Sequence, residues 1–300
     1  MVVHGEREVL PSSTRAEAAR ALEQFTSAYN KADKAYDSSL DADHVTGALA
    51  DIDRARLEAG HTNSPSGNAA HTPLKLSDVK YTIPKKAGWP RWFLAEAQGN
   101  KGGNLHWLLV FTRDGLGRPF KVAYLTLIRP GTLPKVKKDA AGWAEAVPVN
   151  STEFAVPPAD LSKDYAAFLK NGGNIFAPGV HTDQWRARRK KQEKKPGLVT
   201  QFIDEPLISG SYAPLALRTE DGGALVFFTN RRYEKQTAAE GTSIPAQTAG
   251  VRALTTGEVK QSLMLEYMSN GVALDPKRGT GGDQVSVLSR LEGLTSAQGS

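Results

Sequence analysis

Residues 105 to 128, LHWLLVFTRDGLGRPFKVAYLTLI, contain the strongest pair of strand patterns in the sequence. Two apolar runs, rich in aromatic and β-branched residues, flank the turn sequence Asp114-Gly-Leu-Gly117. This pattern predicts two antiparallel strands joined by a hairpin. Apolar residues occupy both alternating sets of the second run, which favours a central strand with one face lining the interior of a curved sheet.

Helices are expected before this hairpin. Thr14 and Glu17 have the spacing of a capping box, and apolar residues then recur at helical spacing through Leu22, Phe25 and Tyr29. A second helical pattern runs from Val45 to Leu57. Further strands are predicted at 74–83, 92–97 and 143–149.

The same order of elements begins again after a proline-containing segment at 149–158, which we interpret as a linker. Helices are predicted at 160–170 and from Thr182 through a basic stretch to Gly197, and strands at 198–203, 215–219, 224–235, 251–267 and 285–291. Leu109-Val-Phe-Thr-Arg113 in the first half resembles Leu225-Val-Phe-Phe-Thr-Asn-Arg231 in the second. The chain is therefore predicted to be an α+β protein with a tether at 1–13 and two similar cone-shaped domains, at 14–148 and 159–295.

Composition excludes several classes of site. The 300 residues contain no cysteine, so disulfides, thiolate metal sites and cysteine nucleophiles are excluded. No apolar run approaches the roughly 20 residues that span a bilayer. The net charge is +6, and the segment from Arg186 to Lys195 holds seven Lys or Arg and one Glu. The excess charge is therefore local, and the chain as a whole is not typical of a polyanion-binding protein.

Several segments together resemble a family of uncharacterised actinobacterial lipoproteins. They are Val3 to Val9 (VHGEREV), Tyr29 to Asp33, Ala123 to Leu125, Thr182 to Arg189 with Trp185, Asp221 to Phe228, and Leu288 to Gly293. The element order also resembles the cystatin-like and SnoaL-type folds. In the lipoprotein family the His-Gly-Glu-Arg-Glu segment follows a lipidated cysteine, and Met1 stands about where that cysteine would be. The resemblance implies an exported, extracytoplasmic protein anchored by lipid to the cell membrane, and it implies no established activity.

The sharpest candidate site is a basic helix that could contact an anionic surface. Its residues are Trp185, Arg186, Arg188, Arg189, Lys190, Lys191, Lys194 and Lys195. An anionic membrane, a cell-wall polymer or an acidic envelope protein would suit this charge, whereas a solvated helix face is the plain alternative. Nucleic acid fits poorly, because aromatic residues do not interleave with the charges.

No motif for a nucleophile, a phosphate loop or a cofactor is present, and no cofactor or bound metal is expected. Asp37, Asp41 and Asp43 cluster after the first helix, where helix capping is the competing explanation for a cation site. An acid or base inside a cone would come from His106, Asp114, Tyr124, Glu234 or Tyr267.

Two functional hypotheses follow from these observations. One is a non-catalytic envelope module that binds or scaffolds. The alternative is a small-molecule carrier or enzyme that uses a cone cavity. They differ in one observable, because a carrier or enzyme needs an open cavity with inward polar groups, whereas a scaffold fills its cones with Trp and Phe.

Overall fold

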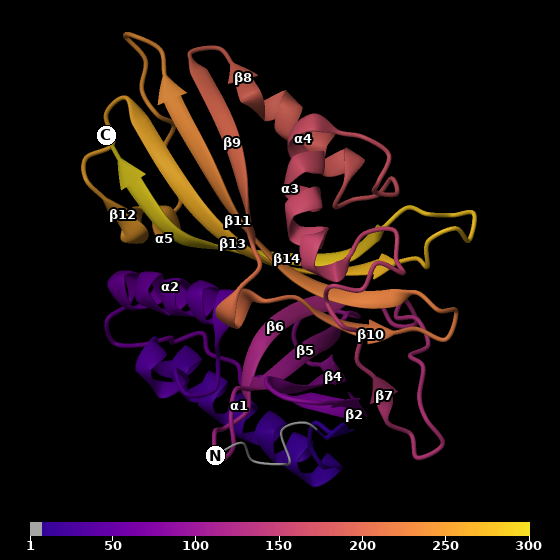
Figure 1. Cartoon of the computed structure of the whole chain (residues 1–300). Coiled ribbons are helices and arrows are strands. Elements are labelled where there is room, and N and C mark those ends of the chain that lie inside the picture. Colours follow the sequence, from indigo (N-terminus) through magenta and orange to yellow (C-terminus); the bar gives the residue numbers. More distant parts are fainter. Residues whose placement is uncertain (1–7) are drawn as a thin grey trace, which may run out of the picture.

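A computed structural model describes residues 8–300, so most of the predicted tether and the His-Gly-Glu-Arg-Glu segment lie outside the described residues. The protein is a mixed α+β structure with several antiparallel sheets and few helices. Figure 1 shows the N-terminal half, residues 8–148, below the C-terminal half, residues 149–300.

The N-terminal half contains two long helices and two small sheets. Its helical elements are α1 (Arg15–Ala35), η2 (Ser38–Leu40) and α2 (Gly47–Asn63). A four-stranded antiparallel sheet has the order β2-β4-β5-β6, from β2 (Leu76–Thr82), β4 (Arg91–Gly99), β5 (His106–Arg113) and β6 (Lys121–Ile128). A three-stranded sheet joins β1 (Leu10–Pro11), β3 (Pro84–Lys86) and β7 (Ala144–Glu145).

The predicted capping box at the start of α1 is confirmed. The Thr14 hydroxyl accepts from the Glu17 backbone N–H at 3.1 Å, and the Glu17 carboxylate accepts from the Thr14 N–H at 2.8 Å. Both contacts satisfy donors that the first turn of a helix leaves free.

The C-terminal half is built around one large, twisted sheet. Its helical elements are η3 (Pro158–Asp160), α3 (Leu161–Asn171), α4 (Asp183–Glu193), η4 (Gly210–Tyr212) and α5 (Ala249–Leu254). The seven-stranded sheet has the order β12-β14-β13-β11-β9-β8, with β10 paired to β11. Its strands are β8 (Lys194–Lys195), β9 (Leu198–Leu207), β10 (Leu215–Arg218), β11 (Ala224–Ala238), β12 (Thr255–Thr256), β13 (Ser262–Asp275) and β14 (Ser286–Gly299).

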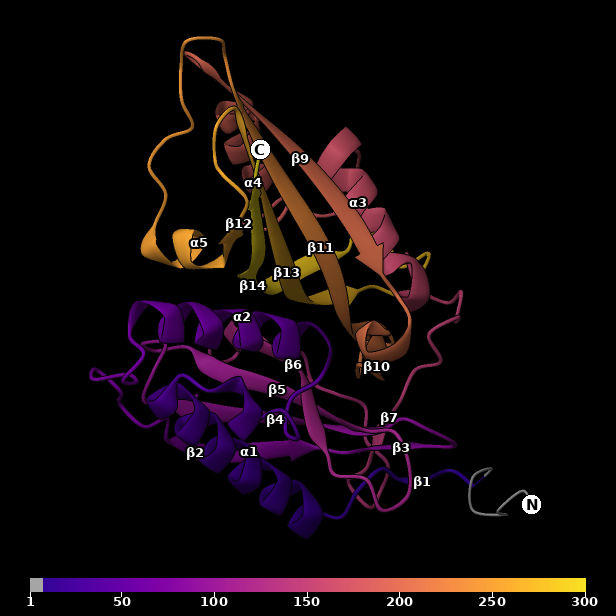
Figure 2. The ribbon, with the colours of Figure 1, turned by 90° about the vertical axis from the view of Figure 1, so that its left-hand side faces the viewer.

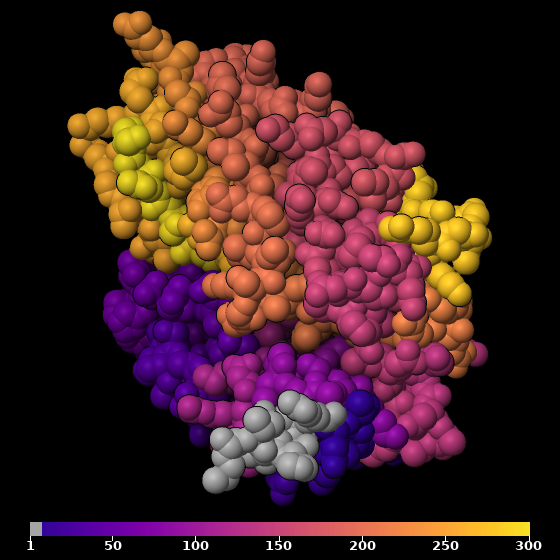
Figure 3. All heavy atoms as spheres, viewed as in Figure 1, coloured from indigo at the N-terminus to yellow at the C-terminus, as the bar shows by residue number. Residues whose placement is uncertain are grey.

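The two large sheets pack face to face, each with a helix on its outer side (Figures 1 and 2). Alternate residues of β4 and β5, such as Phe93 and Phe111, pack beneath α1, whereas Trp92 and Val110 point to the other face. That second face meets a set of apolar side chains from the C-terminal half, Leu215, Leu217, Leu225, Phe227 and Val272. Figure 3 shows the C-terminal half, pink to yellow, stacked directly on the indigo and purple half.

Helix α2 joins the halves along one side. Ala48 and Ile52 pack with Met268 of β13 and with the half-buried Leu207 and Tyr212. The Tyr212 hydroxyl donates to Asp51 at 2.7 Å. The two halves therefore share both apolar and polar contacts.

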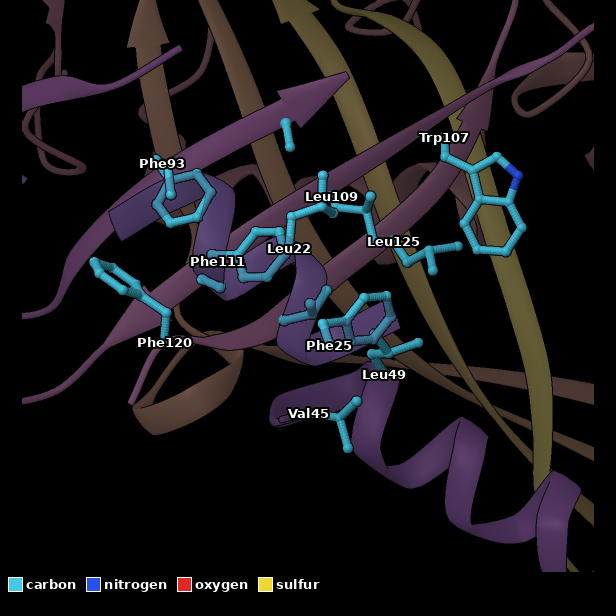
Figure 4. Packing of buried hydrophobic residues seen from close by; sticks show 14 of the residues in the cluster. Leu22, Phe25, Val45, Leu49, Phe93, Trp107, Leu109, Phe111, Phe120 and Leu125 are labelled. Atoms are coloured by element: carbon cyan, nitrogen blue, oxygen red, sulfur yellow. The ribbon is translucent and has the colours of Figure 1, made fainter. Parts of the chain in front are cut away.

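Aromatic side chains fill the space between α1 and the four-stranded sheet (Figure 4). Phe93 and Phe111 stack with ring centroids 4.6 Å apart, and Phe25 of α1 meets Phe111 edge-on at 6.1 Å. Phe120, Trp107 and Leu109 complete this cluster. The interior that the hairpin was expected to line is thus a packed core.

The structure corrects two predictions about strands. β6 is an edge strand of its sheet and not a central one; it is apolar on both faces because the C-terminal sheet covers one face while α1 and α2 pack on the other side. The predicted strand at 251–267 is wrong in its first part, where α5 and the short β12 precede β13.

Two further predictions are altered in detail. Phe154 and Val156 are buried in the C-terminal core, so the proline-containing segment is packed against the protein. Leu109 to Arg113 lie in β5, an inner strand between β4 and β6, and Leu225 to Arg231 lie in β11, an inner strand between β13 and the pair β9 and β10. The similar sequences therefore both lie in inner strands, but the four-stranded and seven-stranded sheets around them differ, and tandem SnoaL-like domains stay a prediction.

Candidate functional site

The candidate basic residues lie on α4 and β8 and divide into three sets. Arg188, Lys191 and Lys195 are exposed and do not line the groove described below, and the Arg188 guanidinium lies 5.6 Å from the Trp185 ring centroid; we call these three the outer row. Arg186, Lys190 and Lys194 line a groove and are called the groove row. Trp185 and Arg189 turn inward, because positions four apart lie on one face of a helix.

Arg189 is a buried ion-pair partner and not a surface charge. Its two terminal nitrogens donate to the carboxylate of Asp204 on β9 at 2.5 and 2.8 Å. The guanidinium also lies 5.0 Å from the Trp185 ring centroid and 5.2 Å from that of Phe202. These contacts hold α4 against the sheet, because breaking a buried pair leaves a charge without compensation.

A second ion-pair network lies beside Trp185 on the same face of the sheet. Arg232 of β11 donates to both carboxylate oxygens of Glu292 on β14, at 3.1 and 2.7 Å, and to Glu234 at 2.8 Å. Arg290 also donates to Glu292. Burial tends to raise the pKa of Glu292, but the charges of Arg290 and Arg232 outweigh it and lower the pKa below its usual value.

This network was missed by sequence reasoning. Its signal is nonetheless present, because Arg232 and Glu234, and likewise Arg290 and Glu292, stand two apart in long strands that are otherwise rich in buried residues. Two-residue spacing places each pair on one face of its strand. The pairing of Asp204 with Arg189 could not be found in this way, since it depends on how α4 packs on β9.

A groove of about 620 Å³ lies between α3, α4 and β9. Its charged lining consists of five cations, Lys170, Arg186, Arg189, Lys190 and Lys194, and two acids, Glu193 and Asp204. Apolar lining comes from Ala166, Leu169, Val199, Phe202 and Ile203. Val199 and Ile203 are 47% and 48% exposed, so this wall of the groove is open to solvent.

The residues that the sequence analysis proposed as an acid or base inside a cone do not gather at one site. His106, the first residue of β5, contacts Glu96 of β4 at 2.8 Å, and Asp114 is exposed in the hairpin turn. Tyr124 lies between the two sheets, where its hydroxyl donates to the Ala213 carbonyl at 2.7 Å and burial raises its pKa. Glu234 and Tyr267 belong to the surroundings of Arg232, whose guanidinium lies 4.0 Å from the Tyr267 ring centroid.

The three aspartates after α1 have separate environments. Asp37 caps η2 by accepting from the Ser39 N–H at 2.9 Å, and Asp43 is exposed near Lys121. Asp41 is buried, and burial together with the neighbouring Asp53 carboxyl raises its pKa. Over residues 8–300, no group of three or more His, Cys, Asp or Glu gathers as a metal site.

Comparison with known proteins identifies the family. A family model described as a domain of unknown function, DUF8094, matches residues 9–299, so the chain belongs to the DUF8094 family. An uncharacterised lipoprotein of Streptomyces coelicolor is 67% identical over 299 residues, covering 100% of this chain and 90% of the relative. An uncharacterised lipoprotein of Streptomyces avermitilis is 54% identical with the same coverage.

A third relative is more distant. It is another uncharacterised lipoprotein of Streptomyces coelicolor, 27% identical over 241 residues that cover 74% of this chain and 63% of the relative. No solved structure matches. Within the described part of the chain, no helix combines the length and the apolar character needed to cross a membrane.

Proposed function

We propose that the protein is a non-catalytic, lipid-anchored component of the cell envelope that binds an anionic cell-wall polymer through the outer row of α4 and β8. The lipoprotein names of the relatives support the anchor and the location outside the cytoplasm. The two halves are proposed to be successive helix-and-sheet modules of the SnoaL type, with their interiors used for packing.

One observation carries the non-catalytic part of this proposal. Stacked aromatic rings occupy the space between α1 and its sheet, where a substrate would have to bind. Tyr165, Phe168 and Phe228 fill the corresponding space beneath α3. Ligand sites in proteins are open concavities with a few converging polar groups, and these two interiors are closed by apolar contacts.

The position of α4 favours the cell wall over the membrane as the anionic surface. Figures 1 and 2 place α4 and β8 at the upper end of the molecule and the N-terminal end of the described chain at the lower end. An anchor attached through the N-terminus would therefore hold the outer row away from the bilayer. Cell-wall polymers with phosphate or carboxylate groups would then be the nearest polyanion.

The test is binding of the whole chain to purified cell wall. We expect co-sedimentation that weakens as salt rises, because exposed charges are screened over about 8 Å at physiological ionic strength. The variant R188Q/K191Q/K195Q should bind at least tenfold more weakly, since each basic residue near an anionic surface contributes on the order of 1 kcal/mol.

A charge-matched control separates a local site from net charge. The variant K31Q/K135Q/K138Q removes three exposed lysines from the N-terminal half and should bind like the parent. Equal loss in both variants would show that binding follows net charge alone. Binding by the parent that is insensitive to salt would also refute the proposal.

A further inference from the structure

The outer edge of β9 is the feature that points to a second binding activity. β9 pairs with β11 along its whole length, from Leu198 to Leu207. On its other side β9 pairs with β8 only at Leu198 and Val199, and no other described strand covers it. An uncovered strand edge presents backbone donors and acceptors that can pair with another chain.

The register shows which peptide groups point outward. The Ala239 N–H donates to the Gly197 carbonyl, so odd-numbered residues of β9 bond to β11. Antiparallel ladders alternate with a period of two, and no bulge interrupts this one. The N–H and C=O groups of Thr200, Phe202 and Asp204 therefore face away from β11.

Pro206 ends this open stretch. It is the next residue in the outward-facing set, and it has no N–H to offer a partner strand. The open edge is thus limited to about five residues, between the short β8 and Pro206. This edge borders the groove, because Thr200, Phe202 and Asp204 are among the residues that line it.

The charged side chains that line the groove favour a negatively charged ligand. Arg186 and Lys190 of α4 lie four residues apart, Lys194 of β8 follows, and Lys170 of α3 adds a further cation. Glu193 is the acid beside them, and Asp204 is already paired with Arg189. A segment that enters the groove would meet an excess of positive charge, which acidic side chains would balance.

The polar edge argues against other occupants. An acyl chain would bury the outward N–H and C=O groups of Phe202 and Asp204 without hydrogen bonds, which is costly. A second copy of this chain would bring the same groove row against itself, and like charges repel. An extended acidic peptide would pair its backbone with the outward N–H and C=O groups of β9, and its carboxylates would balance the cations of the groove row.

We propose that the groove binds an extended, acidic segment of a partner protein, which adds as a strand to the outer edge of β9. The partner is recognised by backbone hydrogen bonds to β9 and by carboxylates that face the groove row, as in other cases of strand addition. The proposal extends the binding role proposed above, but it depends on different residues, so each can fail without the other.

The first experiment measures peptide affinity by fluorescence anisotropy with the whole chain. The probe is a labelled ten-residue peptide that alternates threonine and glutamate. We expect it to bind, and we expect a peptide with lysine in place of glutamate, and an equally charged peptide interrupted by prolines, to bind at least tenfold more weakly. Equal binding of the proline-containing peptide would overturn strand addition.

Two matched variants assign the site. K190Q/K194Q should weaken binding of the acidic peptide about threefold to tenfold, as expected for two partly exposed ion pairs. R188Q/K191Q removes the same charge from the outer row and should change the affinity less than twofold. Equal effects of the two variants would overturn the proposal.

The second experiment measures amide hydrogen exchange at single residues. On binding of the acidic peptide, the amides of Phe202 and Asp204 should slow at least tenfold, whereas those of Gln201 and Ile203, already bonded to β11, should change less than twofold. Uniform protection along β9 would overturn the proposal. Alternating protection produced by phosphatidylglycerol vesicles instead of the peptide would identify a lipid occupant and would also overturn it.

Discussion

The two halves of the molecule use the sheet face beneath their helices in different ways. Beneath α1, residues of β4 and β5 such as Phe93 and Phe111 form a continuous apolar core. Beneath α3 and α4 the face changes along β11, where Val226 and Phe228 are followed at every second position by Asn230, Arg232 and Glu234. The C-terminal sheet thus becomes polar towards α4.

The two kinds of contact contribute differently to the stability of the fold and to the position of the helices. Apolar packing is non-directional, so the N-terminal core fixes α1 mainly by burial and shape. Ion pairs between buried groups require defined geometry, so Arg189 with Asp204 fixes both the distance and the rotation of α4 on β9. The C-terminal half therefore holds its basic helix in one orientation, with the outer row exposed.

A substitution in the N-terminal core should cause the greatest loss of stability. Phe25→Ala should lower the free energy of unfolding by about 3–5 kcal/mol, because it removes a buried ring that contacts Phe111 and Tyr29. Urea denaturation measures this loss. A loss under 1 kcal/mol would show that the apolar face beneath α1 does not stabilise the protein as described.

A second loss of stability is expected in the ion-pair network around Arg232 on the C-terminal sheet. Arg232→Met should cost about 3 kcal/mol, because Glu292 and Glu234 lose their shared partner within the fold. The double variant R232M/E292M, which removes both members of the pair, should recover part of the loss in the same denaturation assay. If the single variant is as stable as the parent, the network contributes no stability. The ion pairs beneath α4 would then differ from the apolar contacts beneath α1 in geometry but would not stabilise the C-terminal half.

A third effect is a dependence on pH. Burial raises the pKa of Asp275 to about 7, although its carboxylate accepts the Val156 N–H. A carboxyl whose folded pKa is raised contributes stability that is complete below the unfolded pKa of about 4 and is lost as pH rises through 7. Asp275→Asn should remove a slope of at most about 1.4 kcal/mol per pH unit between pH 4 and 7.

The control for this pH effect is urea denaturation of both proteins at about pH 3, where the carboxyl is mostly protonated in both folded and unfolded chains. Parent and variant should there differ by less than their difference at pH 7. Parallel stability curves over the whole range would refute the raised pKa.

The sequence predicted elements that depend on local patterns. The capping box of α1 and the 105–128 hairpin both follow from neighbouring residues, and both are confirmed. The edge position of β6 could not be predicted, because its apolar outer face reflects contact with a sheet more than 80 residues away in the chain. Likewise, Arg189 is one of several similar charges in the sequence, and only the fold places it against Asp204.

The shared core between the sheets has a consequence for the covalent chain. Asn150 and Thr152 are exposed in the segment that connects the halves, so a protease can reach this point while Phe227 and Trp92 stay buried against each other. A single cut there should leave one particle by gel filtration and two fragments on a denaturing gel. The backbone connection between the halves is then dispensable once folding is complete, because the contacts of the two sheets and of α2 keep the pieces together.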